Sequence, residues 1–329
     1  LNTSQVNNKI ENVSKTFEVL SNPEFLAEGT AIDDLLNPDR VLIGGENEES
    51  INALSEIYSN WVSKEKILQT NIWSSELAKL TANAFLAQRI SSINSIGAIC
   101  EATGADVREV ARAIGSDSRI GSKFLDSGPG FGGSCFKKDI LNLVYLSEYF
   151  GLKEVADFWN SVVTLNSWHQ HRISRLITKK LFGSLSNKKI AIFGFAFKAN
   201  TNDTRESAAI RISRDLLEEG AFLYIHDPKV DPKQIANDLG MPQKMKINSN
   251  SFLEEGCWTF IEDIYKACDG SDAVLVLTEW EMYSQINWEK VAKSMRKPAW
   301  VFDSRSIVQA ENVKSSGLNF WRIGDGSEK

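Results

Sequence analysis

The sequence lacks a hydrophobic run long enough to cross a bilayer, and its first residues do not read as a signal peptide. It also lacks an excess of basic residues, because 43 acidic residues outnumber 37 Lys and Arg and give a formal net charge of −6. We therefore expect no membrane segment and no nucleic-acid partner. An anionic ligand would need a local group of basic side chains that overcomes the overall negative charge.

Cysteine and histidine are scarce, and their spacing is not that of metal ligands. With no disulfide framework and no metal site indicated, the simplest expectation is a reducing, cytoplasmic setting. The residues concerned are Cys100, Cys135, Cys257, Cys268, His169, His171 and His226.

The 329 residues are 42% hydrophobic and 24% charged, which is ordinary for a globular protein and enough for two or three domains. The pattern predicts an α/β fold in three parts. Residues 1–72 form a partial Rossmann-like unit, 73–183 a helical domain with a long spine helix, and 184–329 a doubly wound parallel sheet. The clearest linker is the stretch 183–187, which contains glycine, two serines and asparagine.

In the first part, the pattern predicts a helix near residues 3–14 and strands at 17–20, 40–45 and 67–70, with a helix at 48–61 between the last two. The second part begins with a proline-free helix at 74–102, roughly 45 Å long at 1.5 Å per residue, which Gly104 would terminate. Shorter helices are expected at 106–114 and after residue 134, and a long one at 155–182. A helix as long as 74–102 typically joins domains or forms a dimer interface.

In the third part, strands at 189–193, 222–225, 273–277 and 300–303 alternate with helices at 207–219, 261–267 and 288–295. Ligands of such sheets bind at the carboxyl ends of the strands. This rule indicates the segments 194–198 and 304–305. The first of them has no G-x-G-x-x-G pattern, so a standard dinucleotide contact is not expected there.

The stretch GPGFGGSCFKKD at 128–139 combines a glycine loop with the start of a helix. We expect Ser134 to be the N-cap and Cys135 to lie in the first turn, where free N–H groups and the helix dipole favour a thiolate. Asp139 would share a helix face with this thiol. The local pattern leaves two interpretations open, a reactive thiol beside a ligand loop and a tight turn followed by an inert cysteine.

The glycines at 128, 130 and 133 also fit the spacing G-x-G-x-x-G of dinucleotide-binding loops. That fingerprint requires a strand leading into the first glycine. The preceding residues 119–127 show neither alternation nor a β-branched run, so we reject the match.

Two further pairs stand four residues apart, Glu24 with Glu28 and Lys79 with Asn83. Each has an ordinary explanation, as a solvated helix start and as solvated helix surface. Together with Cys135 they make a set suited to thioester chemistry, because lysine and asparagine can hold an oxyanion and glutamate can activate water.

Several blocks resemble the UDP-glucose/GDP-mannose dehydrogenase family, and the residues within these blocks favour its UDP-glucose branch. The likeness extends from about Phe17 to Asp303. The blocks are SNPEFLAEGT at 21–30, NPDRVLIG at 37–44, SSEL at 74–77, NAFLAQRISSIN at 83–94, GFGGSCF at 130–136 and GFAFK at 194–198.

The resemblance implies that the C6 alcohol of UDP-glucose is oxidised twice with NAD, through an aldehyde and a cysteine thioester, to UDP-glucuronate. It implies that Cys135 is the nucleophile, that Asp139 orients or activates water, and that Lys79 stabilises the oxyanion. Asn83 is implied as a helper and sugar ligand. Glu24 is implied in proton transfer during hydrolysis.

The resemblance also implies binding residues and an assembly. The cofactor would meet Glu28, Cys135, Lys138 and Arg205, and a homo-oligomer would form through the central helical domain. Arg119 would reach into the site of a neighbouring subunit. The implied substrate contacts are Glu24, Phe25, Leu26, Ala27, Glu28, Lys79, Asn83, Arg119, Asp126, Gly128, Gly130, Phe131, Gly132, Phe197, Lys198 and Arg305.

The sequence also departs from the family pattern. The N-terminal half-domain that carries the family's true G-x-G-x-x-G has no counterpart, which predicts a fragment. Asp126 places a negative charge where a neutral or basic residue is expected. Three hypotheses stay open: a dehydrogenase that is active with the missing half-domain, a sugar-nucleotide-binding remnant, and a cofactor-free thiol hydrolase built on Cys135.

Overall fold

The computed structural model describes residues 8–10, 13–15, 17–244 and 256–327. The chain separates into two compact units, residues 1–83 and 84–329, and we describe each by itself. The division into three domains at 72 and 183 stays a proposal.

The first unit contains two small sheets. The strands β1 (Asn8–Ile10) and β2 (Val13–Lys15) pair antiparallel. The helix expected near residues 3–14 is therefore wrong wherever this stretch is described. Val6, Ile10 and Val13 do stand at helical spacing, but the asparagines at 7, 8 and 12 are weak helix formers.

The second sheet of this unit is a parallel pair, β3 (Val41–Gly44) with β4 (Ile67–Thr70), as the sequence predicts. Between them lie α2 (Glu48–Tyr58), capped by the Asn47 side chain, and the 3-10 turn η1 (Lys64–Lys66); α1 (Ala31–Leu36) precedes β3. The strand expected at 17–20 is wrong, because residues 17–20 have no regular pairing and only Ser21 makes a bridge, with Gly44.

Four helices form the centre of the chain. The helix α3 (Ile72–Thr103) begins in the first unit and continues into the second, and it ends at Gly104, which has a φ of +88°. The second unit continues with α4 (Val107–Gly115), α5 (Phe136–Tyr149) and α6 (Lys153–Lys180). All four match predicted helices within a few residues. Within the second unit, Ser91 of α3 donates to the Val162 carbonyl of α6 at 3.3 Å.

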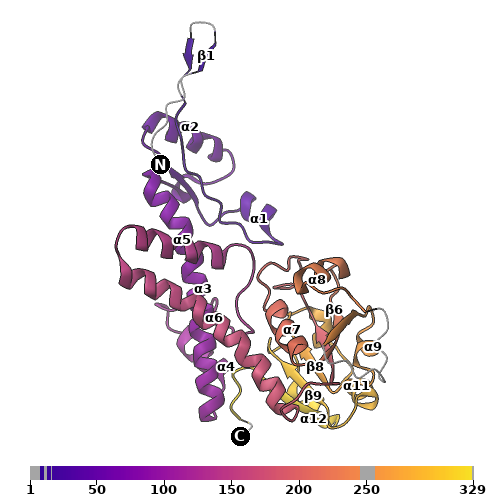
Figure 1. The fold of residues 1–329 in the computed structure, drawn as a ribbon. Coiled ribbons are helices and arrows are strands. Elements are labelled where there is room, and N and C mark those ends of the chain that lie inside the picture. The colour runs from indigo at the N-terminus through magenta and orange to yellow at the C-terminus, as the bar shows by residue number, and fades with distance from the viewer. Residues whose placement is uncertain (1–7, 11–12, 16, 245–255, 328–329) are drawn as a thin grey trace. The chain divides into compact units, whose positions relative to one another are not determined.

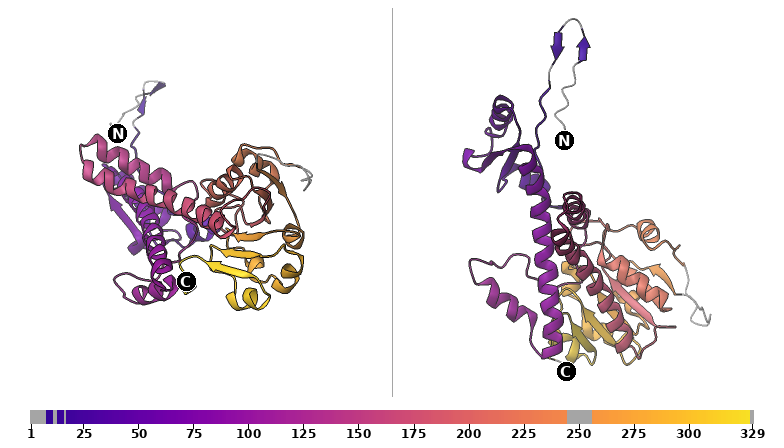
Figure 2. Two further views of the ribbon diagram at one scale, coloured as in Figure 1. Left: turned by 60° about the horizontal axis from the view of Figure 1, so that its bottom comes forward. Right: turned by 60° about the vertical axis from the view of Figure 1, so that its left-hand side comes forward.

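The C-terminal sheet has six parallel strands in the order β10-β9-β8-β5-β6-β7 (Figures 1 and 2). Its strands are nearly continuous apolar runs, as expected for a parallel sheet covered on both faces. The chain leaves the sheet centre in opposite directions from β5 and β8, so the topological switch point lies between them. The strands are β5 (Lys189–Phe193), β6 (Phe222–His226), β7 (Cys257–Phe260), β8 (Ala273–Val276), β9 (Trp300–Asp303) and β10 (Asn319–Arg322).

Helices cover both faces of this sheet, which confirms the predicted doubly wound domain. The helices α7 and α8 contact each other on one face, while α9 and α12 both contact α11 on the other (Figure 1). Sequence analysis missed α8, although Asp231 and Pro232 at its start and Gly240 after its end are ordinary helix signals. The bounds are α7 (Ala208–Glu218), α8 (Pro232–Leu239), α9 (Ile264–Cys268), α10 (Glu281–Ser284), α11 (Trp288–Ser294) and α12 (Ala310–Ser315).

None of the helices that the structure describes has both the length and the apolar character that a bilayer crossing requires. Within the same residues there is no group of three or more side chains arranged to hold a metal ion.

Candidate active site

The glycine loop of the second unit, residues 126–133, connects α4 to α5 and packs tightly against the chain that precedes α7. The amide of Gly133 donates to the Arg205 carbonyl at 2.8 Å. A Cβ at Gly132 would lie 2.6 Å from the Glu206 carbonyl oxygen, so no larger residue fits there without a backbone shift. No strand is described at residues 119–127, which agrees with the rejection of the dinucleotide fingerprint.

Cys135 lies at the start of α5, at the N-cap rather than in the first turn where it was predicted. The thiol residue itself is the N-cap, with φ −97° and ψ −49°, and its side chain makes no capping bond. Ser134 is therefore not the cap, because Gly133 turns the chain with a φ of +84° and the Ser134 hydroxyl lies 3.5 Å from the Cys135 sulfur instead. Cys135 is partly exposed, whereas Cys100, Cys257 and Cys268 are buried.

Asp139 lies one helical turn after the thiol and is buried at 6% exposure. Its amide donates to the Cys135 carbonyl at 2.9 Å, so Asp139 lies one helical turn after the N-cap. A partly exposed sulfur with a buried carboxyl group one turn away is an arrangement that can attack an electrophilic carbon and later direct water to it.

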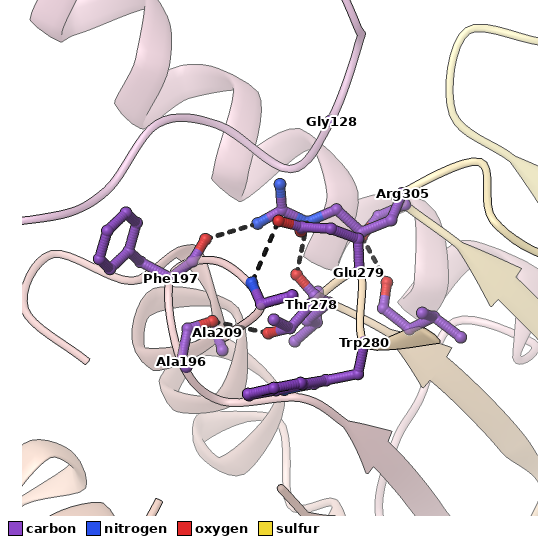
Figure 3. A network of polar contacts seen from close by, with 12 residues as sticks. Gly128, Ala196, Phe197, Ala209, Thr278, Glu279, Trp280 and Arg305 are labelled. Atoms are coloured by element: carbon purple, nitrogen blue, oxygen red, sulfur yellow. Dashed lines mark hydrogen bonds and ion pairs between the residues drawn. The ribbon is translucent and has the colours of Figure 1, made fainter. Parts of the chain in front are cut away.

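Arg305 follows β9 and closes the switch point of the sheet (Figure 3). Its Nε donates to the Leu277 carbonyl at 2.8 Å and its Nη2 to the Phe197 carbonyl at 2.8 Å. Glu279 pairs with the same guanidinium at 3.1 Å. Burial lowers the pKa of Arg305 from its usual value, and the Glu279 carboxylate opposes that shift.

The third nitrogen of this guanidinium, Nη1, makes no hydrogen bond to any described residue and faces the glycine loop. A Cβ placed on Gly128 would lie 3.5 Å from it, so loop and arginine are neighbours (Figure 3). A fixed arginine with free N–H donors beside glycine backbone is suited to a phosphate group.

The loop that carries Phe197 and Lys198 is anchored by a buried carboxylate. Asp227 accepts from the amides of Phe195 at 2.7 Å and Ala196 at 3.1 Å through Oδ2, and its other oxygen accepts two further amides. The Phe197 ring lies against Gly133, 3.2 Å from an added Cβ. The structure thereby brings the predicted ligand loop 194–198 against the glycine loop.

In the first unit, Glu24 and Lys79 form an ion pair of 3.2 Å. The second oxygen of Glu24 accepts from the Leu26 amide at 2.6 Å, which closes a tight turn. Lys79 also lies 5.5 Å from the centre of the Phe25 ring, and Arg40 stacks on the same ring at 3.8 Å. Two residues predicted to act in the chemistry are therefore in contact.

A cavity of about 310 Å³ lies in this unit beside the predicted motif, with Glu24, Phe25, Leu26 and Ala27 among its lining residues. The Ala27 amide is held by Asp34 at 2.9 Å. Asn83 is buried on α3 at 9% exposure. Glu28 does not line this cavity.

Four predicted contacts of the second unit are solvent-exposed. Arg119 pairs with Asp117 at 2.6 Å, and its side chain is 87% exposed. Asp126 and Lys138 are exposed. Arg205 pairs with Asp203 at 2.7 Å and lines a cavity of about 650 Å³, along with Phe131 and Ser134.

Sequence reasoning missed the buried polar residues that fix these loops. They are Asn94, Asn166, His169, Asp227 and Asp303. Asp303 was placed only as the end of a strand, yet its two oxygens accept the amides of Arg305 at 2.9 Å and Val308 at 2.8 Å. The sequence did offer a signal for them. Each is a polar residue that stands either among the apolar positions of a helix or at the end of an apolar strand.

The fold and this arrangement define a doubly wound α/β protein with a fixed arginine and a glycine loop at the switch point of its sheet. Three family models match the chain, the NAD binding domain at residues 2–62, the central domain at 73–168 and the UDP binding domain at 191–310. The chain belongs to the UDP-glucose/GDP-mannose dehydrogenase family, as the sequence blocks predicted.

Individual relatives agree with this family. The chain is 57% identical over 295 residues to the UDP-glucose 6-dehydrogenase of Gallus gallus, which covers 88% of this chain and 59% of that protein. It is 51% identical over 333 residues to the UDP-glucose 6-dehydrogenase of Caenorhabditis elegans, with 100% and 67% covered. The UDP-glucose dehydrogenase structure from Pyrobaculum islandicum matches with a TM-score of 0.79 and 31% identity, over 94% of this chain and 64% of that one.

The chain therefore spans roughly three fifths of the length of the curated relatives it matches.

Proposed function

We propose that this chain binds UDP-glucose and supplies the cysteine nucleophile for the NAD-dependent oxidation of its C6 alcohol to a carboxylate. The observation that carries the proposal is the pairing of two features in one unit. Arg305 directs free donors at the glycine loop, and the same loop leads directly into Cys135. The relatives named above, at 51–57% identity, act on UDP-glucose by their names.

The diphosphate is the part of the ligand that this site fits best. Arg305 offers Nη1 beside Gly128, and Lys198 lies in the loop that Arg305 itself fixes through the Phe197 carbonyl. A partly buried arginine held on two sides loses little side-chain freedom on binding, so its charge-assisted bonds contribute more of their strength. The remaining predicted ligand residues 126–132 would contribute mainly backbone.

The sulfur of Cys135 would act in two stages. It adds to the carbonyl carbon at C6 to give a thiohemiacetal, whose oxidation gives a thioester. Water then adds to the thioester carbonyl, the C–S bond breaks, and the thiolate is released. Asp139, one turn away, would orient that water.

The residues of the first unit would stabilise negative charge and transfer a proton. Lys79 would stabilise the oxyanion at C6 and Asn83 would assist it, while Glu24 would move a proton during hydrolysis. Their contact at 3.2 Å supports a coupled role for Lys79 and Glu24, because opposite charges attract at this distance.

Four residues are proposed contacts of the cofactor. Lys138 is an exposed cation at the start of α5, and Arg205 is an exposed guanidinium, so both fit an anionic pyrophosphate. Glu28 and Cys135 are the other two proposed contacts. When bound, NAD supplies the hydride acceptor for both oxidations.

A homo-oligomer formed through the central helices is part of the proposal. Large apolar side chains are exposed on α5 and α6, and clusters of this kind are typical of protein interfaces. The four free cysteines favour a reducing, cytoplasmic compartment. The exposed side chains include Leu141, Tyr145, Tyr149, Val155, Phe158 and Trp168.

The position of C6 can be tested with a UDP-glucose analogue that carries a chloroacetyl group on the C6 oxygen. Cys135 sulfur should displace chloride and add the ligand mass to the intact protein. Excess UDP-glucose should protect the thiol, and Cys135→Ser should remain unlabelled. Cys268→Ser is the matched control and should label normally, because Cys268 is buried and burial raises the pKa of its thiol to about 12. Labelling that is independent of Cys135, or not prevented by UDP-glucose, would refute this site.

NADH absorbance separates oxidation from binding. Steady NADH formation from UDP-glucose and NAD supports the oxidative proposal, and Glu24→Gln should then accumulate an adduct on Cys135 that intact-protein mass detects. Ligand binding and labelling without any NADH would instead favour the alternative function, a sugar-nucleotide-binding protein without oxidoreductase activity.

A further inference from the structure

Three buried polar side chains on two helices hold the glycine loop, and none of them belongs to the predicted ligand set. Asn94 of α3 and His169 of α6 are each 1% exposed, and Asn166 of α6 is 8% exposed. All three lie in the second unit, and all three bond to the backbone or side chains of residues 127–131.

The bonds fix both ends of this short segment. At its start, Asn94 Oδ1 accepts from the Gly128 amide at 2.9 Å and from the Ser127 hydroxyl at 3.0 Å. The carbonyl of Gly128 lies 2.9 Å from His169 Nε2. Both backbone polar groups of Gly128, which lies beside Arg305, are therefore bonded to helix side chains.

At its end, the Asn166 amide makes a paired contact with Phe131. Its Oδ1 accepts from the Phe131 amide at 2.9 Å, and its Nδ2 donates to the Phe131 carbonyl at 3.1 Å. Gly130 lies so close that a Cβ there would be 2.7 Å from Asn166 Oδ1. The loop has no regular secondary structure, so these side chains take the place of a strand partner.

Asn166 and His169 occupy positions where an apolar residue would be expected. They lie on the buried stripe of α6 that also contains Val162, Ile173 and Ile177. His169 Nδ1 and Asn94 Nδ2 have no hydrogen-bond partner among the described residues. Unpaired buried polar atoms are unfavourable, so these residues are poor choices for packing. Their bonds to the loop give them a reason to be there.

His169 must donate to the Gly128 carbonyl, since both groups would otherwise be acceptors. Burial and the nearby Arg172 guanidinium lower the pKa of His169 to about 4, so its ring is neutral near pH 7. The neutral tautomer with the proton on Nε2 satisfies the carbonyl and leaves Nδ1 as the unpaired atom.

We propose that Asn94, Asn166 and His169 are positioning residues that hold residues 127–131 in the shape that accepts the diphosphate sugar. The inference rests on the proposed function for the identity of the ligand. It predicts that these residues affect affinity by fixing the backbone beside Arg305, without touching the ligand.

The experiment compares Asn94→Ala, Asn166→Ala and His169→Phe in the whole chain. Hydrogen–deuterium exchange of the loop peptide, followed by mass spectrometry, should become at least tenfold faster in each. The dissociation constant for UDP-glucose, measured by titration calorimetry, should rise about fivefold to tenfold, the size expected from one neutral hydrogen bond. His169→Gln retains an N–H donor and should stay within about threefold of the parent chain.

Ser91→Ala is the matched control. Ser91 is 3% exposed on α3 and bonds to the Val162 carbonyl of α6, so it joins the same two helices without touching the loop. Loss of this hydrogen bond should leave the exchange rate of the loop and the dissociation constant for UDP-glucose within twofold of the parent chain. If an alanine variant does not fold, Ser127→Ala replaces it as a milder test. This change removes only one of the two hydrogen bonds that Asn94 accepts, and hydrogen exchange of the loop should still become faster.

Unchanged loop exchange in the folded variants would overturn the inference. Faster exchange with unchanged affinity would overturn it as well, and would leave the proposed function intact. If the parent chain does not bind UDP-glucose, the proposed function fails, and exchange still decides whether these residues fix the loop.

Discussion

The C-terminal sheet and the glycine loop of the second unit are held in shape by different forces. The sheet strands bury apolar residues such as Ile192, Leu275 and Phe302 completely, and their backbone groups pair with neighbouring strands. The loop 127–131 has no strand partner, and a few buried polar side chains bond to its backbone. The comparison teaches that a core mutation should act on the whole unit, whereas a mutation beneath the loop should act on ligand binding.

The largest effect is expected from Phe302→Ala in the centre of the sheet. Removing a fully buried phenylalanine leaves a cavity and should lower the free energy of unfolding by ~3–5 kcal/mol. Urea denaturation followed by circular dichroism measures this. Phe182→Ala is the matched control, because Phe182 is 75% exposed and its loss should change stability by under ~1 kcal/mol. Equal losses in the two variants would contradict this account of the core.

A smaller effect follows from the neutral His169. Its pKa is about 4 in the folded chain against 6.5 as the ordinary value, so the unfolded chain takes up the proton first as pH falls. Stability should therefore be full above about pH 6.5 and decline toward pH 4, by up to ~3 kcal/mol from this residue.

The His169 contribution is isolated by comparing the parent chain with His169→Gln in urea at pH 7 and pH 4.5. The parent should lose more stability between these values than the variant does. Identical losses would show that His169 is not held in its neutral form.

The smallest effect is expected at the surface beside the loop. Lys137 and Glu206 form an ion pair of 2.9 Å, and their side chains are 42% and 49% exposed. Exposed pairs contribute little, so Lys137→Gln should change the free energy of unfolding by under ~1 kcal/mol. A larger loss, abolished by high salt, would mean that charge rather than buried hydrogen bonds holds this region.

Sequence patterns predicted four of the six strands of the C-terminal sheet and the long helices, because these elements repeat a simple apolar period. The strand β4 and the helices α3 and α7 were found within two residues of their observed ends. The same reasoning missed α8 and the strands β7 and β10, and it read 17–20 as a strand because a short apolar run does not reveal whether a pairing partner exists.

The residues of the candidate site that lie in local motifs were predicted from the sequence, whereas the residues that support them were not. Cys135, Asp139 and the loops after β5 and β9 follow from local motifs, and the structure places the last two together around Arg305. The supports are non-local. Asn94 lies 34 residues from Gly128, and His169 lies 41 residues from it. No short window of sequence contains both partners, so only the folded chain shows that these polar residues serve the loop.

The central claim is that Arg305 and the glycine loop bind the diphosphate of UDP-glucose. Titration calorimetry of UDP-glucose into the parent chain and into Arg305→Ala tests it most directly, with circular dichroism to confirm that the variant is folded. Binding should be saturable in the parent and at least tenfold weaker in Arg305→Ala, because charge-assisted hydrogen bonds are lost. Equal affinity in the folded variant, or no binding by the parent chain, would contradict the claim.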